Sequence, residues 1–382
     1  MKKYPFLELS KQVEQCGAAV EKAVVDVLRS GWYLLGEQTR AFEEAFAAYL
    51  GEGEGDGGVT GCNSGTDALI LSLLAAGVQP GDEVVAPALT AVPTVAAIIS
   101  TGATPVLCDV DPATRLMEPD QVEACISSRT RAVIAVHLYG NLVDIPGLRQ
   151  VIGDRPVTLI EDVAQACGAS LHGRAAGTMG DYGAFSFYPT KNLGAMGDGG
   201  AVYCPDPEGV DRLRMLRFYG QEARDRTRLP RGMNSRLDEV QAAVLLEKLP
   251  LLDEWNRQKA ARVQQYEDAL AGCADRIRFA RIRPGAVPGW HLMVLQLVDT
   301  DRQAFQKEMA DRGVSTLVHY PTPMHRQPAF GFGAVSLPVA ERLCDEVISL
   351  PLYPGLAGDD VQAIAGIVQD VLQRTGIDRK GA

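Results

Sequence analysis

The chain of 382 residues has 46% apolar and 6% aromatic residues, enough to bury a sizeable core. Its net charge of −11 argues against a nucleic-acid surface, and no apolar run approaches the ~20 residues that span a bilayer. The N-terminus shows no apolar stretch of the signal-peptide kind. We expect a cytoplasmic globular protein of two domains, or of one large domain with an appendage, that binds neither nucleic acid nor membrane.

The cysteine pattern argues against disulfides and against a metal centre. The eight cysteines are scattered, without a Cys-x-x-Cys pair or a Cys/His pair at metal spacing. This pattern is typical of reduced, mostly buried thiols. We expect no metal site.

The N-terminal segment predicts helices on both sides of an aromatic loop. Residues 10–29 have helical periodicity, and an amphipathic helix with a buried apolar side follows at 37–50. Trp32 and Tyr33 lie on the glycine-flanked loop between them. Aromatic residues on such a loop are either packing residues or part of a site or an interface. Residues 51–58 predict a flexible acidic loop.

A strand, a turn and a helix are expected over residues 59–77. Ser64, Gly65 and Thr66 fall where the helix begins, so their amides and hydroxyls face whatever occupies its N-terminus. The helix dipole favours an anion there. The pattern fits a phosphate site, and it also fits a plain N-cap.

Residues 59–203 alternate between apolar strand candidates and helical stretches. The strand candidates lie at 82–90, 104–111, 131–140, 157–168 and just before Lys191. This alternation indicates an α/β sheet that is largely parallel and covered on both faces. Active-site groups should therefore gather at the carboxyl ends of the strands.

Asp162 and Gln165 follow one of these buried strands. A carboxylate at this place can hold a proton on a ring nitrogen, and a glutamine three residues later can bond a neighbouring oxygen. The alternative is that Asp162 only caps a helix.

Lys191 lies just beyond the end of another strand, in the segment 181–201. Pro189 ends ladder pairing, and Ser186 offers a hydroxyl to an anion. The glycines that follow keep the backbone open. An amine, a hydroxyl and an open backbone suit a phosphorylated carbonyl compound held as a Schiff base. The alternative is a solvated surface lysine.

The chain changes character after residue 204. An arginine-rich helix and loop is followed by a long helical pattern over 237–270 with a kink or break at Pro250. Segments 290–298 and 313–323 resemble strands of a smaller C-terminal α/β domain that ends in a capped helix. We expect a large domain at 1–250 and a small domain at 251–382, with residues 1–30 packing on the small domain.

Six segments together resemble the pyridoxal-phosphate-dependent sugar aminotransferases of the DegT type. They occur in the right order at 64–69, 161–169, 186–201, 232–243, 319–325 and 349–354. The resemblance implies the aspartate aminotransferase fold, called fold type I, with a large, mostly parallel sheet and a small C-terminal α/β domain. The sequence after Lys191, NLGAMGDGGA, is most similar to members that aminate C3 of a nucleotide-linked 3-keto-6-deoxyhexose.

The resemblance also implies roles for residues in pyridoxal 5′-phosphate binding. Lys191 would carry the cofactor as an internal aldimine and shuttle a proton, Asp162 would keep the ring nitrogen protonated, and Gln165 would bond the phenolic oxygen. Ser186, Gly65 and Thr66 would hold the phosphate, and Asn234 would reach it from the partner subunit of a homodimer with shared active sites.

The resemblance implies a ping-pong reaction that transfers the amino group of L-glutamate to the keto sugar, and we expect the nucleotide of that sugar to be dTDP. Sugar-side positions would be Tyr188, His319, Tyr320 and His325, with Trp32 and Tyr33 contributing across the dimer; the histidines also suit structural roles.

Two departures from the family pattern are Ala91, where many relatives have a stacking aromatic, and Cys167, where many have histidine. A 4-keto sugar, a keto-cyclitol and a non-catalytic cofactor- or sugar-binding regulator are the alternatives.

Overall fold

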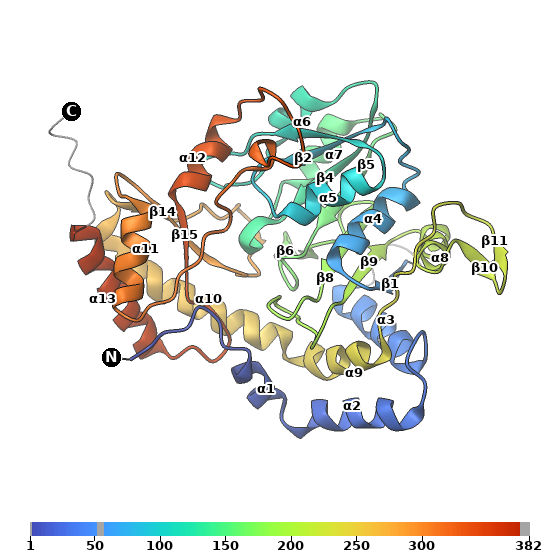
Figure 1. Cartoon of the computed structure of the whole chain (residues 1–382), viewed down its shortest axis with the longest axis horizontal. Coiled ribbons are helices and arrows are strands. Elements are labelled where there is room, and N and C mark those ends of the chain that lie inside the picture. Colours follow the sequence, from blue (N-terminus) through green and yellow to red (C-terminus); the bar gives the residue numbers. More distant parts are fainter. Residues whose placement is uncertain (1, 52–56, 375–382) are drawn as a thin grey trace.

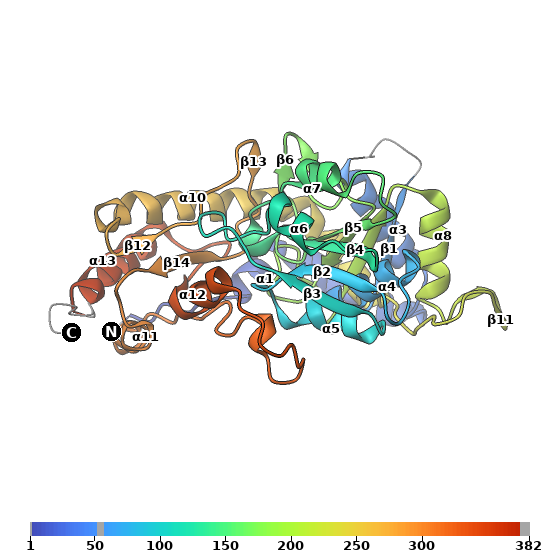
Figure 2. The ribbon, with the colours of Figure 1, turned by 90° about the horizontal axis from the view of Figure 1, so that it is seen from above.

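The structure is a computed structural model that describes residues 2–51 and 57–374. It places most apolar side chains in two clusters, one around a large sheet and one around a smaller sheet near the C-terminus. The two sheets lie at opposite ends of the molecule, and the long helix α10 (Leu252–Leu270) runs toward the smaller one (Figures 1 and 2). Residues 52–56 of the predicted acidic loop lie outside the described residues.

The large sheet has seven strands in the order β1-β9-β8-β5-β4-β2-β3. Strand β9 runs opposite to the other six strands, so the sheet is mixed but mostly parallel, and the predicted α/β class is confirmed. The strands are β1 (Gly58–Cys62), β2 (Glu83–Pro87), β3 (Thr104–Cys108), β4 (Thr130–Val136), β5 (Thr158–Asp162), β8 (Tyr182–Ser186) and β9 (Gly200–Cys204).

Helices cover both faces of this sheet, and its central strands β2, β5 and β8 are therefore almost entirely buried. On one face α4 packs against α5 and α8, and on the other α6 packs against α7 (Figure 2). Several of these helices begin at a capping side chain, such as Ser64 before α4 and Asp206 before α8. They are α4 (Gly65–Ala75), α5 (Val92–Ser100), α6 (Pro119–Cys125), α7 (Ile145–Ile152) and α8 (Pro207–Leu216).

Aromatic side chains join the sheet to the N-terminal helices. The predicted amphipathic helix is α3 (Glu37–Leu50), and its Phe46 ring meets Phe185 and Phe187 edge to face, at centroid distances of 5.0 and 5.4 Å. Helix α3 and helix α2 (Ala18–Ser30) both pack on α9 (Glu239–Lys248). The predicted break at Pro250 is confirmed, since the short 3-10 helix η2 (Leu249–Leu251) separates α9 from α10.

The smaller sheet is antiparallel, in the order β12-β14-β15. Its strands are β12 (Ile277–Arg278), β14 (Met293–Leu297) and β15 (Val347–Leu350), and nearby helices are α11 (Arg302–Asp311), α12 (Pro338–Glu346) and α13 (Gly358–Arg374). The strand predicted at 290–298 is therefore confirmed. The strand predicted at 313–323 is wrong, because this segment makes only two isolated bridges, at Val314 and Leu317.

Short elements complete the described chain. The arginine-rich loop forms a protruding hairpin (Figure 2), and a small sheet has the order β13-β6-β7. The remaining elements are β6 (Ser170–Leu171), β7 (Arg174–Ala175), β10 (Gln221–Ala223), β11 (Arg226–Thr227), β13 (Ala286–Val287), α1 (Ser10–Cys16), η1 (Leu138–Gly140), η3 (Ala271–Cys273) and η4 (Met324–Arg326). No helix in the described ranges is both long and apolar enough to cross a membrane.

The N-terminal segment lies against the C-terminal part of the molecule. Tyr4 forms a parallel bridge with Val314, and its amide donates to the Gly313 carbonyl at 2.8 Å. Tyr4 and Leu7 pack on the second apolar cluster, whereas Phe6 packs on the first. The division into domains at 1–250 and 251–382 stays a prediction, and residues 1 and 375–382 lie outside the described part of the chain.

Candidate active site

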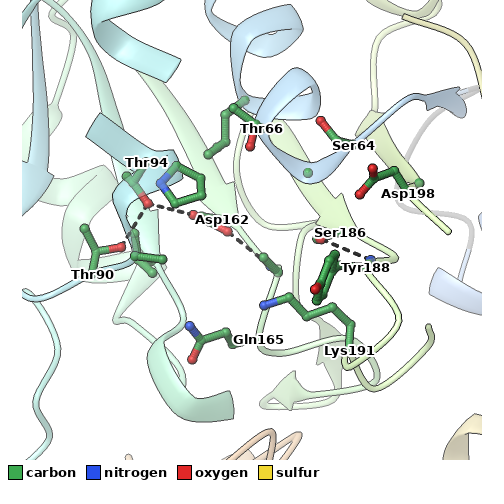
Figure 3. A pocket seen from close by; sticks show the side chains of 17 residues that line it. Ser64, Thr66, Thr90, Thr94, Asp162, Gln165, Ser186, Tyr188, Lys191 and Asp198 are labelled. Carbon is green, nitrogen blue, oxygen red and sulfur yellow. Dashed lines mark hydrogen bonds between the residues drawn. The ribbon is translucent and has the colours of Figure 1, made fainter. Parts of the chain in front are cut away.

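A cavity of about 240 Å³ lies where β5 and β8 end, beside the N-termini of α4 and α5. Six of the predicted cofactor residues line it together, and Figure 3 shows the Lys191 side chain reaching into it with the amine toward Asp162 and Gln165. Its lining includes Ser64, Gly65, Thr66, Leu69, Thr90, Ala91, Pro93, Thr94, Val136, Asp162, Ala164, Gln165, Ser186, Tyr188, Lys191, Asp198 and Gly199.

Asp162 is the last residue of β5 and is buried. Its carboxylate accepts the Ala164 amide at 3.1 Å and the Thr94 hydroxyl at 3.2 Å. Burial raises the pKa of this carboxyl group, while the Ala164 amide and the positive charge of Lys191 act in the opposite direction. A cationic group bound beside Asp162 would therefore lower the raised pKa of this carboxyl group and be held by it.

Thr90 and Thr94 are site residues that the sequence did not identify. Their hydroxyls lie 2.9 Å apart, and because Thr94 donates to Asp162 it accepts from Thr90 (Figure 3). Both lie after β2, at the start of α5. One feature of the sequence could have identified them: they come at or just after the end of a predicted strand, and site residues gather at that edge of the sheet.

Gln165 is fixed from two sides. Its side-chain oxygen accepts the Tyr139 amide at 2.8 Å, and its nitrogen donates to the Tyr320 hydroxyl at 2.9 Å. The amide nitrogen has a second N–H, which leaves one donor for a ligand oxygen. Tyr320, predicted on the sugar side, is thus brought next to Gln165.

The start of α4 has the N-cap and the open first turn that the sequence predicts, which are features of an anion site. Ser64 is the N-cap, since its hydroxyl accepts the Asp67 amide at 3.1 Å. Gly65 and Thr66 occupy the first turn, where backbone amides have no intrahelical acceptor. A Cβ on Gly65 would lie 2.5 Å from Cβ of Ser186, so only glycine lets these amides approach the serine hydroxyl. An anion of phosphate size suits this arrangement.

Lys191 follows a tight turn in which its amide donates to the Tyr188 carbonyl at 2.8 Å. Burial lowers the pKa of its amine to about 8, although the Asp162 carboxylate opposes the shift. A substantial fraction of the amine is therefore neutral near physiological pH, which a nucleophilic lysine requires.

The other predicted site residues lie outside this cavity. Asn234 is exposed beside Ser235, whose hydroxyl donates to Asp67 of α4. Trp32 and Tyr33 are 65% and 50% exposed on the loop between α2 and α3. The chain itself therefore does not bring these three side chains to its own cofactor cavity.

The two predicted histidines lie apart from each other. The ring of His319 stacks on Phe6 and bonds the Ser349 hydroxyl at 2.8 Å, and burial lowers its pKa to about 4. His325 is buried and its Nε2 lies 2.8 Å from Glu341. The sequence allowed either a structural role or a substrate contact for His325, and its contact with Glu341 favours the structural role.

The two departures from the family pattern lie close to the site. Ala91 lines the cavity, and the one aromatic ring among the lining residues is that of Tyr188, which is half exposed. Cys167 is buried and is not among the lining residues, and burial raises the pKa of its thiol to about 12. Neither Ala91 nor Cys167 therefore blocks the space in which a cofactor ring would bind.

The lining residues fit pyridoxal phosphate. Free amides and a serine hydroxyl lie on one side for the phosphate, Asp162 lies on another for a ring nitrogen, and Lys191 lies between them (Figure 3). No described group of three or more His, Cys, Asp or Glu residues is arranged to hold a metal ion. The fold and this site define the class of pyridoxal-phosphate-dependent aminotransferases.

Comparison with known proteins identifies the family. The profile of the DegT/DnrJ/EryC1/StrS aminotransferase family matches residues 14–369, and the chain belongs to this family. The chain is 42% identical to the dTDP-3-amino-3,4,6-trideoxy-alpha-D-glucose transaminase of Streptomyces venezuelae, over 97% of this chain and 96% of that protein.

Two further similarities span almost the whole chain. The erythromycin biosynthesis sensory transduction protein EryC1 of Saccharopolyspora erythraea is 44% identical, over 92% of this chain and 95% of that protein. The crystal structure of S. venezuelae DesV in complex with a ketimine intermediate superposes with a TM-score of 0.93 at 41% identity, covering 98% of this chain and all (100%) of that one.

Replacing Gly65 by alanine tests the phosphate-binding arrangement. The added methyl group would collide with Ser186, so we expect Gly65→Ala to weaken binding of pyridoxal phosphate to the apoprotein by about tenfold or more, ~1.4 kcal/mol. Fluorescence titration gives the dissociation constant. Gly272→Ala, which adds a methyl group in open space, is the control and should bind as the wild type does. Equal affinity of both variants would contradict the assignment.

The lowered pKa of Lys191 predicts a pH profile for its amine in the apoprotein. Because only the neutral amine reacts, labelling by an amine-directed reagent should rise about tenfold per pH unit below pH 8 and level off above it. Peptide mass spectrometry gives the rate at each lysine. Lys22, whose pKa is raised by its bond to Asp26, should keep rising over the same range. A Lys191 profile like that of Lys22 would refute the shift.

Proposed function

We propose that this protein transfers the amino group of L-glutamate to C3 of a nucleotide-linked, most simply dTDP-linked, 3-keto-6-deoxyhexose. The products would be 2-oxoglutarate and the 3-amino sugar. The observation that carries the proposal is the single cavity in which Lys191 lies between the phosphate-binding start of α4 and the carboxylate of Asp162.

Each cofactor-facing residue has a separate task in this proposal. Gly65, Thr66 and Ser186 would hold the phosphate by two amides and a hydroxyl. Asp162, kept in place by Thr94 and the Ala164 amide, would hold a proton on the ring nitrogen. Gln165 would direct its free N–H at the phenolic oxygen. Pyridoxal phosphate, when bound, supplies an aldehyde carbon that takes up the amino group and a ring that accepts electrons.

Lys191 would act both as the attachment point and as the acid-base group. Its pKa of about 8 allows the amine to accept a proton from Cα of the amino donor and to return it on the cofactor side. Reversal of the same steps on the keto sugar completes the ping-pong reaction.

The choice of a 3-keto sugar is supported by the segment after Lys191 and by the name of the S. venezuelae relative, a dTDP-3-amino-3,4,6-trideoxy-alpha-D-glucose transaminase. A 4-keto nucleotide sugar or a keto-cyclitol would use the same machinery, and product analysis separates these cases. The name of the S. erythraea relative raises the alternative of a regulator that binds cofactor without turnover. The complete set of Lys191, Asp162 and phosphate-binding groups favours an enzyme.

We also propose that two copies form a homodimer with shared sites. Exposed apolar side chains lie near the cavity and on the α2–α3 loop, among them Tyr188, Met196, Trp32 and Tyr33. A second copy covering them would remove this surface from water and could direct Asn234 to the opposite phosphate site. The eight free cysteines support the cytoplasm as the compartment.

The proposed reaction is tested by absorbance and by product analysis. Holoenzyme should show a visible band of the Lys191-bound cofactor that L-glutamate converts to a near-ultraviolet band. Lys191→Ala should bind cofactor without the visible band and lose transamination by at least about 10³-fold. Lys307→Ala, on the surface, is the control. Undiminished transamination in Lys191→Ala would sink the mechanism, and amination of only 4-keto sugars would refute the C3 assignment.

Shared sites predict complementation between an impaired variant and an inactive one. Asn234→Ala should weaken cofactor binding and activity, and Lys191→Ala should be inactive. A mixed dimer would contain one site with both native residues. Unfolding the two variants, mixing them and refolding them together should therefore restore activity. If Asn234 serves only its own subunit, the mixture will stay as inactive as its parts.

A further inference from the structure

Asn192, the residue after Lys191, is buried in a set of hydrogen bonds that leads back to the candidate active site. It is only 4% exposed. Its side-chain nitrogen donates to the side-chain oxygen of Asn256 at 2.8 Å and to the Gly289 carbonyl at 2.5 Å. Its side-chain oxygen lies 3.2 Å from Nδ1 of His291. Both N–H groups and the oxygen of the Asn192 amide are therefore used.

His291 acts toward Asn192 as a neutral donor. Burial, and after it the positive charge of Lys191, hold the pKa of its imidazole well below the usual range. Because the Asn192 oxygen can only accept, the ring proton lies on Nδ1. The contacts of Asn192 are thus all between uncharged groups, and they stay the same over the pH range in which the Lys191 amine titrates.

A first path of hydrogen bonds runs from Asn192 through helix α10. Asn256, which accepts from Asn192, donates from its own nitrogen to the Cys167 carbonyl at 3.0 Å. Gly168 makes this approach possible, since a Cβ there would lie 2.4 Å from the Asn256 nitrogen. Its φ of +83° also favours glycine. The path ends two residues beyond Gln165.

A second path runs from Asn192 through Gly289. The Gly289 amide donates to the Gly140 carbonyl at 2.9 Å. Gly140 directly follows Tyr139, whose amide donates to the side-chain oxygen of Gln165 at 2.8 Å. Two paths therefore join the residue after Lys191 to Gln165 and to the segment that carries it.

The Lys191 amine lies at the end of a flexible chain, directed toward Asp162 and Gln165 (Figure 3). Such a chain delivers its amine accurately only from a fixed backbone, and a misplacement of about 1 Å can cost about a hundredfold in rate. We propose that Asn192 is a positioning residue that fixes the backbone of Lys191 relative to Gln165 along both paths. The reaction step that it serves rests on the proposed transamination, but the geometry that it fixes does not.

The first test needs cofactor but no substrate. Asn192→Leu removes the three hydrogen bonds of Asn192 and keeps a side chain of similar size. The visible band of cofactor bound to Lys191 shows circular dichroism because the ring is held in one orientation. We expect the ratio of dichroism to absorbance in this band to fall about twofold or more in Asn192→Leu. Loss of cofactor or of stability alone would lower both signals together and leave the ratio unchanged.

Gln296→Leu is the matched control. Gln296 is also 4% exposed and loses a hydrogen bond, which it donates to Glu346 at 2.7 Å in the native protein, but it lies in the small sheet on β14. It should keep the wild-type ratio of dichroism to absorbance.

The second test separates positioning from binding. At saturating L-glutamate, the visible band should disappear in Asn192→Leu about thirtyfold or more slowly than in the wild type. The L-glutamate concentration that gives half of this rate should change by less than about threefold. A wild-type ratio of dichroism to absorbance, or a loss confined to the half-saturating concentration, would overturn the proposal.

A second variant keeps the proposal testable if Asn192→Leu does not fold. Asn256→Ala breaks the first path and leaves the second, so we expect a smaller loss of the saturated rate, about tenfold. In the double variant the two losses should not multiply, because both changes act on one network. Wild-type dichroism and rate in Asn256→Ala would contradict the proposal. If L-glutamate leaves the visible band of the wild type unchanged, the proposed function fails, while the dichroism still decides the role of Asn192.

Discussion

The parallel pairing of β5 with β8 sets the position of every group in the candidate active site. The register places Asp162 opposite Ala184, so the two strands end at the same edge and Ser186 and Lys191 follow directly. The start of α4 reaches this edge because Gly65 leaves room against Ser186. A shift of one residue in this pairing would turn Asp162 away from the cavity, since successive side chains alternate between faces.

Much of this arrangement could be predicted from the sequence because it depends on local patterns. Buried apolar runs marked the strands, and polar residues after them marked the sheet edge, which led to Asp162, Gln165, Ser186 and Lys191. The direction of β9 could not be predicted, since a fully buried strand has the same apolar pattern whether it runs parallel or antiparallel. The segment 313–323 has the residues of a strand but lacks a continuous pairing edge.

Contacts between side chains of distant segments could not be predicted from the sequence, for a different reason. Nothing near Thr94 in the sequence shows that its hydroxyl meets Asp162, and nothing near His325 shows its bond to Glu341. Lys259 lies in a helical pattern rich in charged residues, where most lysines face solvent, yet α10 turns it inward. Such contacts follow from how helices and sheets pack, which a single sequence does not record.

The position of the N-terminal segment against the C-terminal part of the molecule affects the order in which the protein can fold during synthesis. Tyr4 pairs with Val314, and Lys2 bonds Asp360, 358 positions further along the chain. During synthesis the first residues therefore cannot form these contacts until nearly the whole chain has left the ribosome. Contacts of such long range form late in folding, so the large sheet can assemble before the N-terminal segment takes its place against the C-terminal part of the molecule.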